Sequence, residues 1–439
     1  MTKRSIEEKP SPRELTQPPA EELPDRIYST AFGIAIRPKA NDDGINIPSH
    51  EDEDAEASLK KCVYTIINTS LLIPGDGTPT KDAALVIENK VIAWVGAQSH
   101  VPSMYTDAPH RTFAIPFLMP GLWDCHAHFG GEGPDAEESD NVSIAATRRS
   151  ATSRAGGCEV SRAIDDGSIV GPTVYSAGAC LSQTAGHGDI FALPAGDAHL
   201  SFGIAGAARP GHWGSSQSML VDGVDECRRA VRLQIRRGAR CIKVFASGGV
   251  LSRDDNPLYA QFGADELACI VEEAARQHRV VAAHVHGKPG ILAAVRAGVR
   301  TVEHVSFADR ECIDLIREKG TVYIATRTIV DMLLRGGGKG LSRPQWEKAR
   351  LCGSNHLKAY KLAIEAGVSI ALGTDTSPGF NMAMELDYAV QAGMTSLEAI
   401  KAATADGPLS VEDQAARTGQ LKVGYEADIL GCWRTLLMM

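Results

Sequence analysis

Short apolar runs alternate with longer amphipathic stretches through the middle of the chain. An apolar run at 239–247 precedes a helical pattern at 264–279, and a second apolar run follows at 280–286. In the first helix, Leu267 and Ala274 lie on one face at helical spacing. The same order continues with helix 290–298, strand 301–305, helix 308–320, strand 321–328, helix 343–367 and strand 368–375. This alternation predicts an α/β fold with a parallel sheet.

Two architectures fit the alternation, a doubly wound sheet and a closed (β/α)8 barrel. A dinucleotide-binding doubly wound sheet carries GxGxxG after its first strand, and this chain has no such motif there. Polar residues near the ends of several strands favour a TIM-like barrel. Seven barrel strands are predicted, at 117–128, 172–177, 240–247, 280–286, 301–305, 321–328 and 368–375. The eighth should lie between 130 and 170, where no convincing β run stands.

The regions on either side of this alternation have a different pattern. Residues 1–58 are polar and rich in Pro, Glu and Asp, which predicts a disordered or loosely packed tail. Two β-branched runs at 63–73 and 83–96, separated by the turn sequence PGDGTPT, predict antiparallel strands. The stretch 418–433 predicts one or two more strands of the same small β unit.

Charge and cysteine usage narrow the class of protein. The chain has 439 residues with 45 Lys and Arg against 54 Asp and Glu, a net charge of −9. The absence of a basic stripe argues against nucleic-acid binding, and the absence of a long apolar run argues against a membrane span. Ten cysteines without a CxxC pair, and an N-terminus without an apolar leader, predict reduced thiols in a cytoplasmic protein.

Histidines at strand ends are the candidate chemistry. His126 and His128 stand at i and i+2 in DCHAHFGG, so on a strand both imidazoles face the same way. Such a pair is typical of two ligands of one metal ion. Two hydrogen-bonded histidines in the core explain the pattern equally well. Further candidates at the ends of later strands are His284, His286, His304 and Asp375. Their combination at one barrel mouth favours a metal site.

Lys243 lies in the middle of a predicted strand, between Ile242 and Val244. A buried ammonium is costly, so the side chain either faces outward or is modified or paired. A neutral amine can react with carbon dioxide to give a carbamate whose two oxygens bridge two divalent ions. Imidazole and oxygen donors suit zinc best, with manganese or iron as alternatives. Two such ions activate a bridging hydroxide, and Asp375 can pass its proton to a leaving amine.

These residues and their local motifs resemble the binuclear metal-dependent amidohydrolase superfamily. PGLWDCHAHFGG, SQTAGHGDIFALPAG, IKVFASGGVLSRDDNP, AAHVHGK and IALGTDTSPG are similar to the ochratoxinase and prolidase-like carboxypeptidase branch. The resemblance covers roughly residues 60–130 and 158–430.

The resemblance implies a (β/α)8 barrel with a small β-sandwich made from both chain ends. The expected divisions are a tail at 1–58, sandwich at 59–116, barrel at 117–415 and a short C-terminal part of the sandwich at 416–439. It implies hydrolysis of an amide that joins an acyl group to an amino acid, in an N-acyl amino acid, a dipeptide or an ochratoxin-like compound. It also implies a small-molecule substrate and assembly into homo-oligomers.

The resemblance further implies a role for each candidate residue. His126 and His128 would bind one ion, and His284 and His304 the other. N6-carboxylated Lys243 would bridge the two ions, and Asp375 would be both ligand and proton shuttle. His286 would act beside the substrate carbonyl. His187 and Arg253, in loops after strands, are weaker candidates for contacts to a substrate carboxylate.

Two departures from the family pattern stand out. The branch carries a second barrel strand after HxH, and here AATRRSATSRAGG takes its place. The chain also ends soon after YEADIL. We therefore expect a truncated or mis-spliced enzyme whose metal ligands survive. A non-catalytic remnant, and a lactonase or phosphotriesterase on the same scaffold, are the competing functions.

Overall fold

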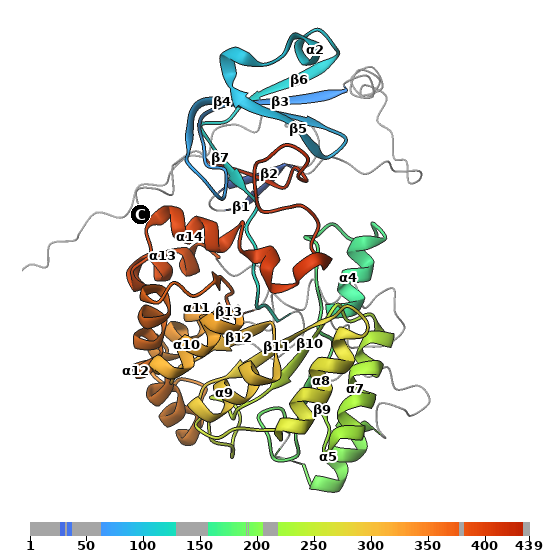
Figure 1. Ribbon diagram of the computed structural model, residues 1–439, viewed down its shortest axis with the longest axis vertical. Coiled ribbons are helices and arrows are strands. Elements are labelled where there is room, and N and C mark those ends of the chain that lie inside the picture. Colours follow the sequence, from blue (N-terminus) through green and yellow to red (C-terminus); the bar gives the residue numbers. More distant parts are fainter. Residues whose placement is uncertain are drawn as a thin grey trace, which may run out of the picture.

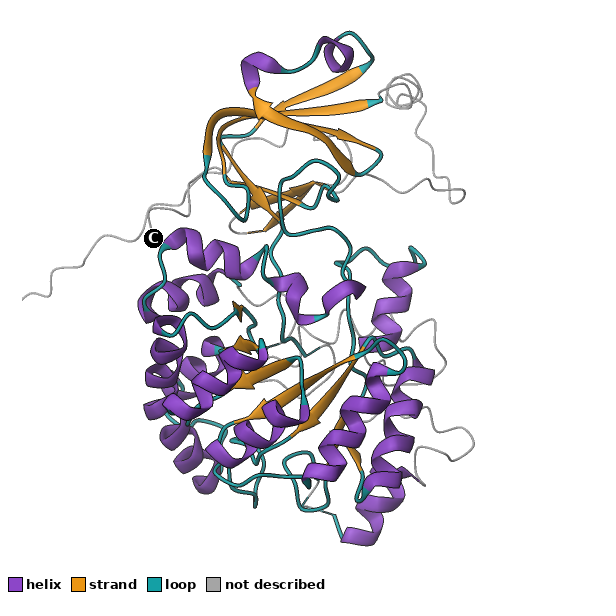
Figure 2. Ribbon diagram, in the orientation of Figure 1, coloured by secondary structure: helices purple, strands orange, loops and turns teal. Residues whose placement is uncertain are grey.

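The computed structural model describes residues 27–30, 33–36, 63–128, 157–189, 191, 193–204, 218–376 and 382–432. These residues form two sheets with separate apolar cores. Figure 1 shows the eight-stranded sheet above the α/β unit, which contains the seven-stranded sheet, and Figure 2 shows that helices gather almost wholly around this lower sheet.

The seven-stranded sheet is parallel and has the strand order β14-β13-β12-β11-β10-β8-β9. Its strands are β8 Cys180–Ser182, β9 Ser218–Leu220, β10 Cys241–Phe245, β11 Val280–Val285, β12 Thr301–His304, β13 Val322–Ile324 and β14 Ile370–Ala371. The predicted α/β fold with a parallel sheet is confirmed, and the arrangement is consistent with a TIM-like barrel.

Helices alternate with these strands along the chain. They are α4 Gly157–Asp165, α5 Ala195–Phe202, α7 Val224–Arg237, α8 Ala264–Ala275, α9 Lys288–Ala297, α10 Arg310–Lys319, α11 Arg327–Arg335, α12 Arg343–Glu365, α13 Ala383–Ala392 and α14 Ser396–Ala403. Three short 3-10 turns span Gln98–His100, Gly407–Ser410 and Glu412–Gln414. Among the described helices, none combines the length and the apolar character that crossing a bilayer requires.

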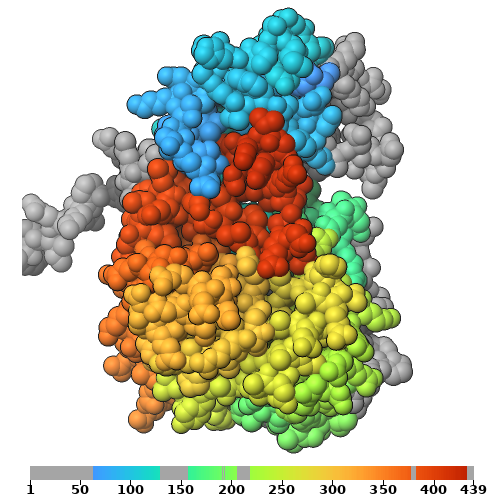
Figure 3. Space-filling view, viewed as in Figure 1, coloured from blue at the N-terminus to red at the C-terminus, as the bar shows by residue number. Residues whose placement is uncertain are grey.

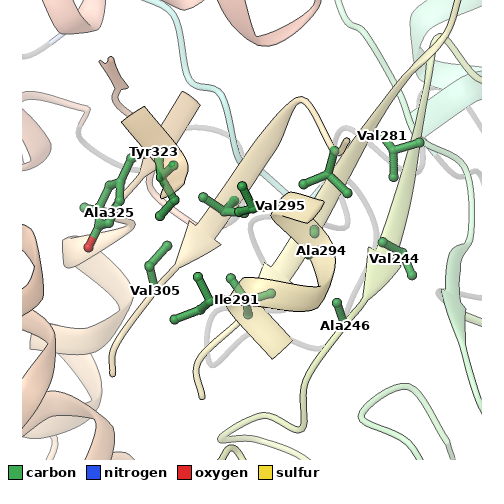
Figure 4. Close-up of a cluster of buried hydrophobic side chains, with 14 of the residues drawn as sticks. Val244, Ala246, Val281, Ile291, Ala294, Val295, Val305, Tyr323 and Ala325 are labelled. Carbon is green, nitrogen blue, oxygen red and sulfur yellow. The ribbon is translucent and has the colours of Figure 1, made fainter. Parts of the chain in front are cut away.

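Burial of the helix faces against the strands explains the alternation seen in the sequence. Leu267, Ile270 and Ala274 of α8 are buried as their spacing predicts. Figure 4 shows side chains of β10, β11, β13 and α9, among them Val244, Val281 and Val295, meeting in one apolar cluster. A core of this size orders the strands and so fixes where their carboxyl ends lie.

Some predicted strand limits are wrong. Residues 172–177 form no strand, and the strand in that region is β8, further along the chain. Gly178, with φ of +69°, turns the backbone between the two segments. The predicted strand 321–328 ends at Ile324, and its last residues begin α11 instead. Strand β9 was not predicted, because three residues are too short to give a pattern.

The predicted strand 117–128 divides between the two sheets. Phe117–Pro120 forms β7 of the eight-stranded sheet. Residues 125–128 instead run beside the end of β14: Cys125 N donates to Leu372 O (2.9 Å), Asp375 N to His126 O (2.7 Å) and His128 N to Thr376 O (2.9 Å). An isolated parallel bridge joins Ala127 to Thr376. Residues 125–128 therefore extend the parallel sheet beyond β14.

The eight-stranded sheet combines segments from both regions that flank the α/β unit. Its order is β1-β2-β15-β7-β3-β4-β5, with β6 also paired to β3. The strands are β1 Ile27–Thr30, β2 Gly33–Ile36, β3 Tyr64–Leu72, β4 Thr80–Glu88, β5 Val91–Ala97, β6 His110–Ala114, β7 Phe117–Pro120 and β15 Ile429–Cys432, with a short helix α2 Ser103–Thr106. Figure 3 shows the C-terminal part of the chain, in red, packed against the N-terminal part, in blue.

The predicted gap in the barrel falls mainly on residues 129–156, which lie outside the described residues. The described part of the interval, from 157 to 170, contains α4 and no strand. The predicted tail at 1–58 likewise lies outside the described residues, apart from β1 and β2. Among the described residues no ladder joins β9 to residues 125–128.

The buried core of the parallel sheet gives a first prediction. Ile242 in β10 is fully buried, so Ile242→Ala should lower the free energy of unfolding by about 2–5 kcal/mol through lost apolar contact and a residual cavity. Met104 on α2 is 61% exposed, and Met104→Ala should change the free energy of unfolding by less than about 0.5 kcal/mol. Urea unfolding of both variants measures the difference. Equal losses would contradict the assignment of the core.

Candidate metal centre

Two histidines from one strand meet a carboxylate from the neighbouring one. His126 Nε2 lies 3.1 Å from Asp375 Oδ1, and His128 Nε2 lies 2.7 Å from the same oxygen. The ladder between residues 125–128 and the end of β14 brings these groups together across almost 250 positions of sequence. The i and i+2 spacing therefore points both imidazoles toward one carboxylate.

Three more imidazoles approach from β11 and β12. The ring centroids of His284 and His304 are 4.6 Å apart, and that of His126 is 5.2 Å from His304. His286 lies 4.8 Å from His284 and 5.1 Å from His304. Parallel strands end at one edge of the sheet, so side chains from different strands converge there.

Hydrogen bonds on the outer side of these rings decide which nitrogen faces inward. Thr326 gives its hydroxyl proton to Ala325 O, so His304 Nδ1 donates to Thr326 Oγ1 at 2.7 Å. His284 Nε2 donates to the carbonyl of Gly248 at 3.3 Å. In each ring the other nitrogen keeps its lone pair, which is the form that binds a metal ion.

Lys243 enters the same region from β10. Its Nζ contacts Glu303 Oε2, which also lies 3.4 Å from His126 Nδ1. The Lys243 side chain is 10% exposed and that of Glu303 is 2% exposed. The buried amine is therefore paired with a carboxylate and points into the sheet interior, not outward between helices.

Left-handed backbone marks the ends of these strands. The φ angles are +68° at His304, +51° at Val305, +53° at Thr326 and +56° at Asp375. A β-branched residue rarely adopts this conformation, which costs about 1–3 kcal/mol per residue. Packing of the surrounding core maintains these strained conformations. The left-handed backbone directs metal-facing side chains inward from two different strands.

Burial sets the protonation of the cluster. Desolvation lowers the pKa of His284 and His304 well below the usual value, so both rings are neutral near pH 7. Burial also lowers the pKa of Lys243 to about 8, whereas Asp375 opposes that shift. Burial alone would raise the pKa of Asp375, but His126 and His128 outweigh it and hold this carboxyl ionised.

The donor set fits a divalent metal. Ligand atoms of His126, His304 and Asp375 all lie within 4.8 Å of one another. Neutral imidazole nitrogens and a carboxylate are the donors that zinc and related ions prefer. The structure therefore brings together the six predicted metal ligands, His126, His128, Lys243, His284, His304 and Asp375, and also His286, which was predicted to act beside the substrate carbonyl.

The two weaker candidates behave differently. His187 stacks on His284 with ring centroids 4.4 Å apart and planes at 19°, so it borders the cluster. Arg253 is exposed, and among the described residues no hydrogen bond or ion pair joins it to the cluster. Of these two side chains, only His187 is placed to touch a substrate held at the cluster.

Sequence reasoning missed Glu303 and Asp124. Glu303 precedes His304, and strict alternation on a strand would turn the two side chains to opposite faces. The left-handed turn at His304 defeats that rule. Asp124 accepts from His126 N (3.1 Å), Thr374 N (3.0 Å) and Thr374 Oγ1 (2.7 Å), which ties the first strand to the last. Its position two residues before His126 was the available signal.

A cavity of about 340 Å³ lies away from this cluster. It is lined by Ala275, His278, Arg279, Val280, Glu412 and Asp413. Val280 begins β11, so the cavity is at the amino ends of the parallel strands. Active sites of barrel enzymes lie at the carboxyl ends, so this cavity is not the candidate site.

Comparison with known proteins agrees with this geometry. Residues 117–432 match the profile described as "Amidohydrolase family". Ochratoxinase of Aspergillus niger is 54% identical over 396 residues, which cover 85% of this chain and 82% of that protein.

Solved structures give the same result. The crystal structure of A. niger ochratoxinase superposes with a TM-score of 0.79 at 52% identity, covering 86% of this chain and 91% of that one. A Xaa-Pro dipeptidase with bound methionine in its active site superposes with a TM-score of 0.69 at 26% identity, covering 83% of this chain and 93% of that one.

A buried carboxyl near the cluster predicts how stability changes with pH. Burial raises the pKa of Glu385 from 4.5 to about 7, although its carboxylate accepts from Thr328 N. The folded state therefore holds this proton more tightly than the unfolded chain. The protonated Glu385 carboxyl therefore contributes fully to the free energy of unfolding below pH 4.5. This contribution, roughly 3 kcal/mol, is lost as pH rises to 7.

Glu385→Gln should remove this dependence. The wild-type protein should lose free energy of unfolding relative to the variant between pH 4.5 and 7, measured by denaturant titration in the presence of a chelator. Glu365→Gln, at an exposed position on α12, should follow the wild type. A constant difference between wild type and Glu385→Gln across this range would refute the assigned shift.

Proposed function

The chain belongs to the amidohydrolase family, metal-dependent hydrolases of carbon–nitrogen bonds, and we propose that it hydrolyses the amide joining an acyl group to an amino acid. The substrate class comprises N-acyl amino acids, dipeptides and ochratoxin-like compounds. Its 54% identity to a protein named ochratoxinase supports the last of these.

One observation carries the proposal: imidazoles from residues 125–128 and from β12 converge on Asp375 at the carboxyl ends of the parallel sheet, with those of β11 beside them. His126, His304 and Asp375 offer ligand atoms within 4.8 Å of one another. The neutral rings of His284 and His304 have lone pairs that would bind divalent ions without losing a proton first. Core packing alone gives no reason to bury so many imidazoles around one ionised carboxylate.

We extend the proposal to a closed barrel with a flanking sandwich. The ladder between residues 125–128 and 372–376 supports closure, because it adds the first strand to the sheet beside the last. The eight-stranded sheet contains strands from both flanking regions, as a sandwich built from both ends requires.

The proposed ligands divide between two ions, for which zinc is the best match. His126 and His128 would hold one ion, and His284 and His304 the other, with N6-carboxylated Lys243 between them. Two bound ions would supply a water molecule that is deprotonated near neutral pH and would polarise the substrate carbonyl. Glu303 would hold the unmodified amine of Lys243 in place.

The remaining roles fall to side chains that would face the substrate. Asp375, ionised in the folded protein, would accept a proton from the attacking water and deliver it to the leaving amine. His286 is fixed by Ser306 Oγ, 2.8 Å from its Nδ1, so its Nε2 would stabilise charge on the carbonyl oxygen. His187 would contact the substrate carboxylate, and Arg253 would approach it only from the exposed loop.

We also propose that the protein is a cytoplasmic homo-oligomer without nucleic-acid or membrane partners. The nine cysteines of the described residues all carry free thiols, which agrees with a reducing compartment. Light scattering of the purified protein measures the subunit number. A monomer at micromolar concentration would contradict the oligomer proposal.

The test of function combines metal analysis with a substrate panel. Purified protein should contain about two divalent ions per chain and should cleave N-acyl amino acids, dipeptides or ochratoxin-like amides. A chelator should abolish turnover, and zinc should restore it. Hydrolysis of lactones or phosphotriesters alone would favour the alternative enzyme classes. Absence of both bound metal and turnover would favour a non-catalytic remnant and overturn the proposal.

Lys243→Ala tests the proposed bridge. The variant should lose at least one ion per chain, and turnover should fall by about 100-fold or more, since even groups outside the ligand shell cost 10- to 100-fold. Acetate or propionate in solution should partly restore both quantities by supplying a carboxylate. Lys361→Ala, at an exposed position on α12, should keep both. Full metal content and turnover in Lys243→Ala would exclude the bridge.

A further inference from the structure

His187 is held in a tight slot beside the metal cluster. One face of its ring stacks on His284, with centroids 4.4 Å apart, and Phe245 meets it edge-on at 4.9 Å. A Cβ on Gly249 would lie 2.1 Å from the His187 ring, so the slot exists only because this residue is glycine. The ring therefore has little freedom to slide or rotate.

A chain of hydrogen bonds fixes which nitrogen of His187 is available. Ser252 Oγ donates its single proton to Asp255 Oδ1, so it accepts from His187 Nδ1 at 2.8 Å. Asp255 Oδ2 lies 3.5 Å from the same nitrogen and also accepts from Gly249 N at 2.7 Å. These groups engage Nδ1, so Nε2 is the atom left to meet a substrate.

Lys348 reaches this network from a different part of the fold. Its Nζ donates from α12 to Ser252 O (2.6 Å), Asp255 Oδ1 (2.8 Å) and Asp255 O (3.3 Å). The side chains of Lys348 and Asp255 are 12% and 2% exposed. Burial would raise the pKa of Asp255, but His187, Lys348 and Ser252 outweigh it and keep the carboxyl ionised.

Apolar contacts dock the same loop on the same helix. Val250 is buried against Ala349 and Cys352 of α12, with Trp346 packed at the edge of this cluster. Gln345 Nε2 also donates to Leu251 O. The loop that carries Ser252 and Asp255 is thus anchored along the first turns of α12, and Lys348 is the charged group at the centre of the contact.

We propose that Lys348 and Asp255 are positioning residues that hold His187 with its Nε2 toward the substrate. Neither touches the metal cluster, and each acts through the His187 ring. The hydrogen bonds around Nδ1 and the slot beside Gly249 fix the ring, so Nε2 keeps one position beside the cluster. This inference rests on the proposed function, because it assigns the contact to an amide substrate held at the cluster.

The kinetic test uses the metal-loaded enzyme and an N-acyl amino acid. Lys348→Met keeps most of the apolar stem and should raise KM by roughly 10- to 100-fold with little change in kcat, because the lost contact is the same in ground and transition states. Asp255→Asn and Gly249→Ala should give the same signature. A merely structural role would instead lower the active fraction, and hence the apparent kcat, at unchanged KM.

Two comparisons separate positioning from general damage. The double variant His187→Ala/Lys348→Met should be no worse than His187→Ala alone, since Lys348 acts through that ring. Lys348→Arg should recover part of the loss, and Lys361→Met on the exposed side of α12 should match the wild type.

Crystal structures of the metal-loaded wild type and Lys348→Met complete the experiment. The wild type should show the His187 ring stacked on His284, and the variant should show it displaced or in two positions. An active wild type with additive effects of the two substitutions, or an unmoved ring, would overturn the positioning role alone. A wild type with the ring in place but no amide hydrolysis would overturn the proposed function alone.

Discussion

The short parallel ladder between residues 125–128 and the end of β14 is the constraint on which the site depends. Three backbone hydrogen bonds join segments almost 250 residues apart and bring two histidines onto Asp375. Asp124 accepts two further hydrogen bonds from Thr374 across the same ladder. Hydrogen bonds to Thr326 and Gly248, on the outer side of the rings, determine which nitrogens of His304 and His284 remain available for a metal ion. Backbone pairing thus sets the distances between the histidines and Asp375, and the outer hydrogen bonds determine which ring nitrogens can bind a metal ion.

Local pattern predicted the α/β unit because burial repeats there with a clear period. The helical spacing of Leu267, Ile270 and Ala274 and the apolar runs of β10 and β11 are each sufficient to identify an element. The same logic predicted the cluster, since polar groups at the ends of parallel strands meet at one edge. It failed at 172–177, where Gly178 turns the chain, and at the three-residue strand β9, which is too short to carry a period.

Long-range electrostatic partners could not be predicted in this way. Nothing local in the sequence connects Lys348 with Asp255, or Glu303 with Lys243, because each pair is set by the tertiary packing of two elements. Glu303 was hidden further by the left-handed backbone at His304, which breaks the alternation of faces along the strand. Histidines were easier to find than their carboxylate partners because they are rare and because strand ends are a recognised place for them.

The position of β15 has a consequence for biosynthesis. This strand lies between β2 and β7, so the eight-stranded sheet is interrupted until the last part of the chain is available. Translation at about 5–20 residues per second delays β15 after β7 by roughly 15 to 60 s. During that interval β7, which leads directly into the histidine strand, has an unpaired edge. Such edges invite contact with other nascent chains, so chaperones that shield them should raise the yield of this protein more than its stability would indicate.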